Sequence, residues 1–194
     1  LKRAELEEEL DALIGPLEPE DLEQQMERLR QFAQGNRLRV AAADLTGAIP
    51  LMVVSDYLTD IAEASLERVV SLTYGHLVAR HGAPAGVEEG GCGFLVVGYG
   101  KLGGIELGYG SDLDLVFLHG SDNVNDMTAG PKAITNDQFY SRLGQRALHM
   151  MTTPTASGIL YEVDMRLRPD GNKGLLVRSL ASFAQYQSSQ AWTW

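Results

Sequence analysis

The first thirty residues have the spacing of amphipathic helices. Large apolar residues recur every three or four positions, at Leu6, Leu10 and Leu13 and again at Leu22, Met26 and Leu29. Residues three and four apart share one face of an α-helix, so each set predicts an apolar stripe. Gly15-Pro16 separates the two sets and predicts a break, because both residues disfavour a helix interior. We expect two helices whose acidic residues, ten against four basic ones, form a solvated face.

The helical pattern continues beyond these two helices. Alanines and leucines extend it over 38–49, and Pro50 predicts an end because the residue before a proline avoids the helical region. A third helix is expected from Ser55, as its N-cap, to about Arg80, with Gly82 as the terminating residue. Residues 1–83 therefore form a helical N-terminal segment in this interpretation.

After a turn-rich connector over 84–91, the period of the pattern changes. Short apolar or alternating runs predict strands at 94–97, 113–118, 159–167 and 174–177. Between them, 121–131 is polar and predicts a loop, 136–151 has helical spacing, and Ser179 is expected to cap a final helix. The whole chain is therefore expected to be α+β, with residues 84–194 forming a sheet flanked by helices.

Composition narrows the class of protein. Of 194 residues, 44% are hydrophobic and 22% charged, which is typical of a packed fold. The chain has 16 basic and 26 acidic residues, and the resulting net charge of −10 argues against a general nucleic-acid binder. A single cysteine, Cys92, excludes an internal disulfide and a thiolate zinc cluster. With neither a signal peptide nor a membrane span in the pattern, we expect a cytoplasmic protein.

The glycine-dense segment 98–114 is open to two interpretations. Residues 98–103 match G-x-G-x-x-G after a strand, the pattern of a dinucleotide-binding turn. That fold needs a helical crossover of about ten or more residues, whereas seven residues separate Gly104 from Asp112. The spacing disfavours a dinucleotide site.

The second interpretation is a phosphate-facing turn followed by a metal site. Gly103-Gly104 would form the turn, and Asp112 and Asp114, two apart on a strand, would point to one face. Asp164, in the middle of a predicted strand, is the natural third carboxylate. Hard divalent cations prefer such oxygen ligands, and two of them can bridge the oxygens of a triphosphate. The alternatives are a solvent-facing edge strand at Asp112 and Asp114, and a structural ion pair of Asp164 with Arg166 or Arg168.

Two long motifs carry a resemblance to a known family. The run G-x-G-K-L-G-G-x-E-L-x-Y-x-S-D-L-D-L at 98–115, followed by G-x-L-Y-E-V-D-M-R-L-R-P at 158–169, resembles the glutamine synthetase adenylyltransferase/adenylyl-removing enzymes. These belong to the nucleotidyltransferase superfamily and have a polymerase-beta-like palm. Segments 38–44, 54–59 and 191–194 resemble the C-terminal, adenylylating half. We expect the chain to be a piece of a longer polypeptide, with a helical region after Trp194.

The resemblance implies a reaction and roles for individual residues. AMP would pass from ATP to a tyrosine hydroxyl of glutamine synthetase, releasing pyrophosphate and lowering the activity of that enzyme in nitrogen regulation. Asp112 and Asp114 would hold magnesium ions, two being expected, and Asp164 would complete the site and help to deprotonate the tyrosine. Backbone and hydroxyl donors of Gly103, Gly104 and Ser111 would lie against the triphosphate, and charge would be neutralised by Lys101, Arg166 and Arg168. The family is also regulated by the signalling protein PII and by glutamine, whose sites the sequence does not locate.

Two other functions remain open at this stage. The adenylyl-removing half uses the same carboxylates for phosphorolysis of the AMP–tyrosine bond, so those residues do not separate the halves. A regulatory domain that binds ATP without turning it over is a second alternative. Retention of all three carboxylates argues against such a sensor, which could lose Asp164 and still keep the phosphate turn.

Overall fold

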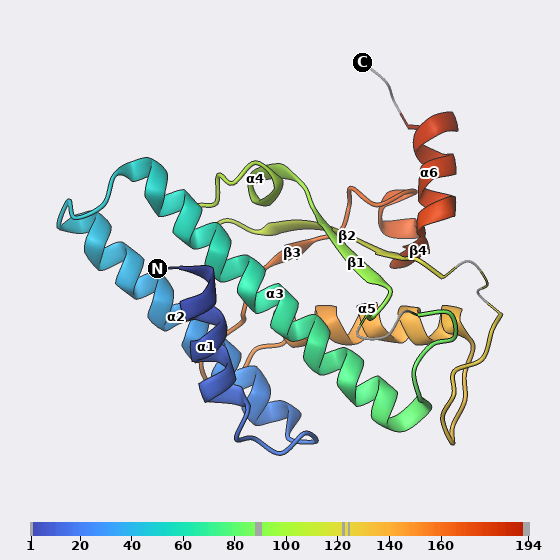
Figure 1. Cartoon of the computed structure of the whole chain (residues 1–194). Coiled ribbons are helices and arrows are strands. Elements are labelled where there is room, and N and C mark those ends of the chain that lie inside the picture. The colour runs from blue at the N-terminus through green and yellow to red at the C-terminus, as the bar shows by residue number, and fades with distance from the viewer. Residues whose placement is uncertain (1, 88–90, 122, 124, 192–194) are drawn as a thin grey trace.

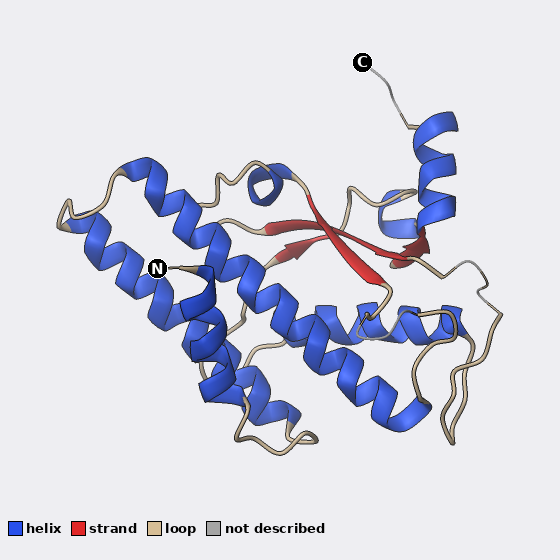
Figure 2. Ribbon diagram, in the orientation of Figure 1, coloured by secondary structure: helices blue, strands red, loops and turns tan. Residues whose placement is uncertain are grey.

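The computed structural model describes residues 2–87, 91–121, 123 and 125–191. Trp192, Thr193 and Trp194 of the closing motif, with parts of the connector and of the polar loop, lie outside this range. The described elements are α1 (Arg3–Ile14), α2 (Leu22–Leu45), α3 (Leu51–His81), β1 (Phe94–Gly98), α4 (Gly100–Gly103), β2 (Leu113–His119), α5 (Asn136–Thr152), β3 (Val163–Asp164), a 3-10 turn (Gly171–Lys173), β4 (Val177–Ser179) and α6 (Leu180–Ser189). Figure 2 shows the helices and the small sheet in this arrangement. The predicted α+β class is confirmed.

The first two helices form where the apolar spacing predicts them. α1 ends at Ile14, directly before the Gly15-Pro16 break. α2 begins after Asp21, whose side chain accepts a hydrogen bond from the Gln24 amide at 3.0 Å and so satisfies an otherwise unpaired donor. The alanine- and leucine-rich stretch belongs to α2, which ends at Leu45 rather than reaching Ile49.

The predicted start of the third helix is wrong. Pro50, not Ser55, is the N-cap of α3, and Ser55 lies inside the helix. Proline lacks an amide hydrogen and has a fixed φ, so it suits a helix start, where amides have no intrahelical acceptor. The predicted end is confirmed: Gly82 follows His81 with φ of +77°, and a β-carbon there would lie 2.2 Å from the Gly130 nitrogen.

The sheet is mixed and centred on β2. β1 pairs with β2 antiparallel, whereas β3 and β4 both pair with β2 parallel. Figure 1 shows α5 running beneath the sheet and crossing α3. α5 contacts α3 on one side and β3 and β4 on the other. The helical segment and the sheet therefore share one core, while the domain boundary after residue 83 stays a prediction.

The strand predicted over 159–167 shrinks to two residues, Val163 and Asp164. The amides of Leu160 and Tyr161 donate to the Met151 carbonyl at the end of α5, at 3.0 and 3.3 Å, instead of pairing with a strand. Beyond Asp164 the chain turns, because its carboxylate accepts a hydrogen bond from the Arg166 amide at 2.8 Å. Alternation stops there, and the Leu167 side chain is exposed.

The last predicted strand is displaced along the chain, whereas the cap of the last predicted helix is confirmed. The strand expected at 174–177 forms later, at Val177–Ser179, because a left-handed Asp170 and the 3-10 turn occupy the preceding residues. Ser179 caps α6 as predicted, accepting a hydrogen bond from the Ser182 amide at 3.2 Å. None of the helices in the described ranges is both long enough and apolar enough to cross a membrane.

One buried cation joins the helical segment to the rest of the fold. The Arg30 side chain of α2 is fully buried and donates to the carbonyls of Met26 at 2.8 Å, Met150 at 2.9 Å and Gly158 at 2.7 Å, and also to that of Thr153. Two of these carbonyls belong to the end of α5 and its cap, and one belongs to the turn that follows. A buried charge persists only when its donors are satisfied, so Arg30 determines how α2 and α5 dock.

Replacing Arg30 with Met should therefore destabilise the fold strongly. The variant keeps an apolar stem but leaves buried carbonyls without donors, which should lower the free energy of unfolding by roughly 2–4 kcal/mol. Urea denaturation followed by circular dichroism measures this change. Arg28→Met on the exposed side of α2 is the control and should change stability by less than about 0.5 kcal/mol. Equal effects in the two variants would contradict the role assigned to Arg30.

Candidate active site

Three carboxylates converge at the end of the sheet. Asp112, Asp114 and Asp164 each place an oxygen within 4.8 Å of oxygens from the other two. The parallel pairing puts Asp164 directly beside Asp114, and the Leu113 amide donates to the Glu162 carbonyl at 2.9 Å. Two segments about fifty residues apart in the chain are thereby brought together, as the choice of Asp164 for the third carboxylate predicts.

This donor set fits a hard divalent cation. It consists of carboxylate oxygens alone, which such cations prefer. The backbone in front of it is shaped to leave Asp114 room: Gly100 has φ of +54°, and a β-carbon there would lie 2.2 Å from Asp114 Oδ2. The Tyr99 amide donates to the Asp114 carbonyl at 2.9 Å and keeps the two segments together. Gly100 is thus a site residue that the sequence analysis did not identify, because the glycine pattern alone does not distinguish it from the neighbouring glycines.

The structure also bears on the dinucleotide interpretation. Only one helical turn, α4, follows β1, and β1 and β2 run antiparallel. A dinucleotide-binding unit has parallel strands joined by a full helix. The interpretation that the spacing disfavoured is therefore excluded.

Gly103 and Gly104 close the α4 turn. Their amides donate to the carbonyls of Tyr99 at 3.1 Å and Gly100 at 3.0 Å. A β-carbon on Gly103 would meet the Gly98 carbonyl oxygen at 2.6 Å, so the packing requires glycine there. Because both amides already have acceptors, contact with a triphosphate would use the exposed surface of the turn. Their phosphate-facing role stays a prediction.

Ser111 and Lys101 flank the carboxylates in different ways. The Ser111 hydroxyl oxygen accepts a hydrogen bond from the Gly108 amide at 3.0 Å, which leaves its hydrogen to donate. Lys101 lies on the exposed side of α4. Both roles suggested by the family resemblance stay predictions.

Arg166 is paired with the third carboxylate. Its amide donates to Asp164 Oδ1 at 2.8 Å, and its Nε donates to Asp164 Oδ2 at 2.7 Å. These bonds, the side-chain bond first, lower the pKa of Asp164. The ion pair of Asp164 with Arg166 is therefore present, and the role of Asp164 as a metal ligand stays a prediction.

Arg168 lies in the same region of the molecule as the carboxylates. A cavity of about 510 Å³ is lined by Asp112, Glu162, Asp164, Arg166 and Arg168, among others. Arg168 Nη1 donates to the Met165 carbonyl at 2.8 Å, while its buried Nε has no acceptor among the described residues. An anionic ligand in this cavity would meet two guanidinium groups next to the carboxylates.

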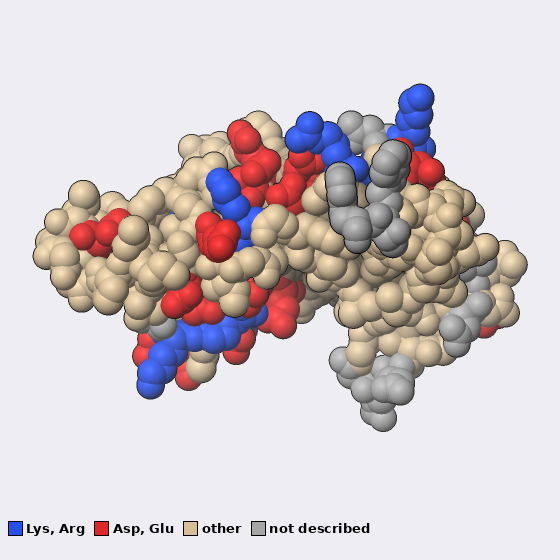
Figure 3. All heavy atoms as spheres, turned by 90° about the horizontal axis from the view of Figure 1, so that it is seen from above, with Lys and Arg blue, Asp and Glu red and all other residues tan. Residues whose placement is uncertain are grey.

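Charges of both signs are interleaved on one face of the molecule. On the face seen in Figure 3, acidic and basic side chains lie next to one another.

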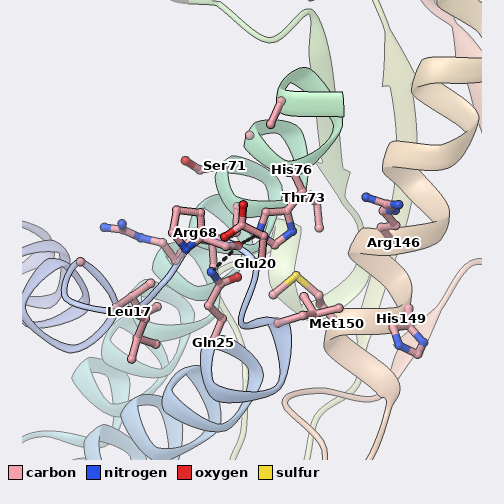
Figure 4. Close-up of a pocket in the computed structure, with 17 residues that line it drawn as sticks. Leu17, Glu20, Gln25, Arg68, Ser71, Thr73, His76, Arg146, His149 and Met150 are labelled. Atoms are coloured by element: carbon pink, nitrogen blue, oxygen red, sulfur yellow. Dashed lines mark hydrogen bonds between the residues drawn. The ribbon is translucent and has the colours of Figure 1, made fainter. Parts of the chain in front are cut away.

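A separate cavity of about 710 Å³ lies between α2, α3 and α5 (Figure 4), lined by residues that include Gln25, His76, Arg146 and His149. None of the predicted site residues lines it. His76 contacts the Pro19 carbonyl there.

The site also has supports that sequence analysis missed. Asp44 and Arg37 of α2 contact the segments that lead into Asp112 and Asp164. Both contacts join residues far apart in the chain, so no local pattern could have found them.

Comparison with known proteins gives a consistent family. A family model described as glutamate-ammonia ligase adenylyltransferase matches residues 2–194. Bifunctional glutamine synthetase adenylyltransferase/adenylyl-removing enzymes are similar to this chain at 55% identity over 192 residues in Pseudomonas syringae pv. tomato and 54% over 197 residues in Thioalkalivibrio sulfidiphilus. These matches cover 98% and 100% of this chain but 19% and 20% of those proteins, so the chain spans about a fifth of the curated relatives.

Replacing Gly100 with Ala should disturb the carboxylate cluster. The added methyl group collides with Asp114 Oδ2 and strains a left-handed backbone, so we expect about tenfold weaker Mn²⁺ binding and roughly 1 kcal/mol lower stability. Electron paramagnetic resonance of Mn²⁺ measures the affinity. Gly110→Ala is a matched control, because nothing lies within 4 Å of its β-carbon. Unchanged affinity in Gly100→Ala would contradict the assigned role.

The Asp164–Arg166 pair should lower the pKa of Asp164 below that of an ordinary aspartate in the metal-free chain. Because its pKa is lowered in the folded state, the pair stabilises the fold above about pH 4 and loses that contribution as the pH falls through the folded-state pKa. Arg166→Gln should raise the pKa of Asp164 towards about 3.9. A carbon-13 NMR titration of the carboxyl group measures it, with Arg39→Gln as control. An unchanged pKa in Arg166→Gln would assign the effect to other groups.

Proposed function

Because this chain belongs to the glutamate-ammonia ligase adenylyltransferase family, we propose that it holds the adenylylating active site of a longer enzyme. The reaction transfers AMP from ATP to a tyrosine hydroxyl of glutamine synthetase and lowers the activity of that enzyme. The convergence of Asp112, Asp114 and Asp164 beside two arginines carries the proposal. The names of the relatives, which include glutamine synthetase adenylyltransferase, support the substrate.

The three carboxylates would hold two magnesium ions. These ions, when bound, would neutralise triphosphate charge and lower the pKa of the attacking hydroxyl. Asp114 and Asp164 lie directly opposite one another on paired strands, so both face the same ligand. Asp112, the exposed member, completes the set from the loop side.

The remaining residues would bind and orient ATP. Arg166 is largely exposed, with 74% of its side chain accessible, so it can leave Asp164 for a phosphate oxygen. Arg168 offers a buried Nε that needs an acceptor, and Lys101 and the Ser111 hydroxyl add donors from the α4 side. The exposed surface of Gly103 and Gly104 would lie against the triphosphate, since neither carries a side chain.

The chemical step balances on these groups. The tyrosine oxygen forms a bond to the α-phosphorus, and the bond from that phosphorus to the leaving pyrophosphate breaks. Asp164 would accept the tyrosine proton once Arg166 has moved away, because the pair with Arg166 otherwise keeps the carboxylate a weak base. Departure of Arg166 therefore both frees the base and supplies a cation to the phosphates.

The adenylyl-removing reaction is a second candidate on the same residues. The relatives are named for both activities, and this chain spans only a fifth of them. Phosphorolysis would use the same carboxylates with phosphate as the attacking group. The likeness of segments 38–44 and 54–59 to the adenylylating half favours the first direction. A site that senses ATP without turnover would not need all three carboxylates.

Three broader features are proposed for the full-length enzyme. The family resemblance implies control by the signalling protein PII and by glutamine, so both are proposed as regulators. A single cysteine and the family's substrate fit a cytoplasmic location.

The intact mass of glutamine synthetase measures the proposed reaction. Incubation of the unmodified enzyme with this chain, magnesium and ATP should add AMP to its subunits. Asp114→Asn should abolish the addition, because an amide keeps the size of the side chain but loses its charge, whereas Asp137→Asn on α5 should leave it unchanged. A parallel reaction contains AMP-modified enzyme and phosphate.

Each outcome of this experiment has a distinct meaning. AMP gained only with ATP supports the adenylylating assignment, and AMP lost only with phosphate assigns the other half. Transfer at the wild-type rate by Asp114→Asn would overturn the metal-site assignment.

A further inference from the structure

Helix α2 contacts, through one of its faces, the two chain segments that lead into the candidate site. The Tyr109 hydroxyl donates to Asp44 Oδ2 at 3.0 Å, and Arg37 Nη2 donates to the Leu160 carbonyl at 3.1 Å. Arg37 and Asp44 are seven residues apart, close to two helical turns, so they lie on the same side of α2. One rigid element therefore reaches two segments that are distant in the chain.

The first of these segments is the loop that precedes Asp112. It runs from Gly104 to Asp112 and is held to the core by Leu107, which is 2% exposed. Tyr109 follows, three residues before Asp112, with 45% of its surface exposed. The bond to Asp44 ties this otherwise exposed part of the loop to a helix and so restricts where the chain enters β2.

The second is the segment that precedes Asp164. Tyr161, 7% exposed, lies three residues before Asp164, and the Arg37 guanidinium sits 4.1 Å from the centre of its ring. A cation over an aromatic face is an attractive contact that adds to the bond from Arg37 to Leu160. β3 pairs through only two residues, so its placement depends on this preceding anchor.

We propose that Arg37 and Asp44 are positioning residues: they hold the segments before Asp164 and Asp112 and so support the spacing of the carboxylates that the β2–β3 pairing brings together. This inference rests on the proposed function, because it concerns the same cation site. Metal affinity is sensitive to groups that orient the ligands, since a carboxylate displaced by a fraction of an ångström loses part of its interaction. The helical N-terminal segment is on this view a structural part of the active site.

Substitutions that remove single contacts test the proposal through Mn²⁺ binding, measured by electron paramagnetic resonance. Tyr109→Phe removes one hydroxyl from an exposed ring, and Arg37→Met keeps an apolar stem without its charge. Each should weaken binding by about tenfold. Asp44→Leu should match Tyr109→Phe, whereas Asp44→Asn keeps an acceptor oxygen and should restore near wild-type affinity. Binding that persists in Asp114→Asn is subtracted as unrelated surface binding.

Thermal unfolding of the same variants separates positioning from general destabilisation. Tyr109→Phe should keep the wild-type unfolding temperature while losing affinity, and Arg39→Met, an exposed arginine of α2 that pairs with Glu9, should keep both. Wild-type affinity in Tyr109→Phe and Arg37→Met would overturn the positioning role while leaving the cation site intact. A wild-type chain that binds no Mn²⁺ above the Asp114→Asn background would overturn the cation site itself, and the positioning role with it.

Discussion

The fold depends on a buried guanidinium that forms no salt bridge within the described residues and bonds to backbone carbonyls instead. Arg30 is satisfied by backbone carbonyls from α2, from the end of α5 and from the turn after it. Carbonyls are fixed in position, unlike the flexible side chain of an acid, so this arrangement permits one docking geometry of α2 on α5. Without those acceptors the charge would cost several kcal/mol to bury. The position of α2 relative to the sheet follows from this requirement.

Arg30, Arg37 and Asp44 then form a series on one face of α2. They are spaced seven residues apart, and each contacts a different part of the chain beyond residue 84. Arg30 contacts the end of α5, Arg37 contacts the segment before Asp164, and Asp44 contacts the loop before Asp112. The first contact is buried and fixes the helix, and the other two are nearer the surface and hold the segments that precede Asp164 and Asp112. A single helix thus contacts both the core and the segments that lead into the site.

Much of the architecture was predictable, for physical reasons that differ between elements. Helices with apolar residues every three or four positions, a glycine at Gly82 and a serine cap at Ser179 carry local signals, and all were found. The strand predicted over 159–167 was too long because Leu160 and Tyr161 are buried by packing and by bonds to the Met151 carbonyl, which alternation does not distinguish from a strand. The start of α3 differs from the prediction because Pro50, with its fixed φ and no amide hydrogen, caps the helix five residues before Ser55.

The candidate site shows the same division. Convergence of the three carboxylates follows from alternation and from the motifs. The need for glycine at position 100 follows from a backbone angle, and the contacts of α2 join residues 65 and 123 positions apart, so neither is visible in a local pattern.

The shortness of β3 has a consequence for working temperature. Asp164 is held to β2 by a ladder of two residues, whereas the core of the molecule is held by buried helices. Short pairings at the end of a sheet open at a lower cost than global unfolding. On warming, we therefore expect Asp164 to leave the cluster while the helices are still folded, so that the carboxylate cluster is lost below the melting temperature of the chain.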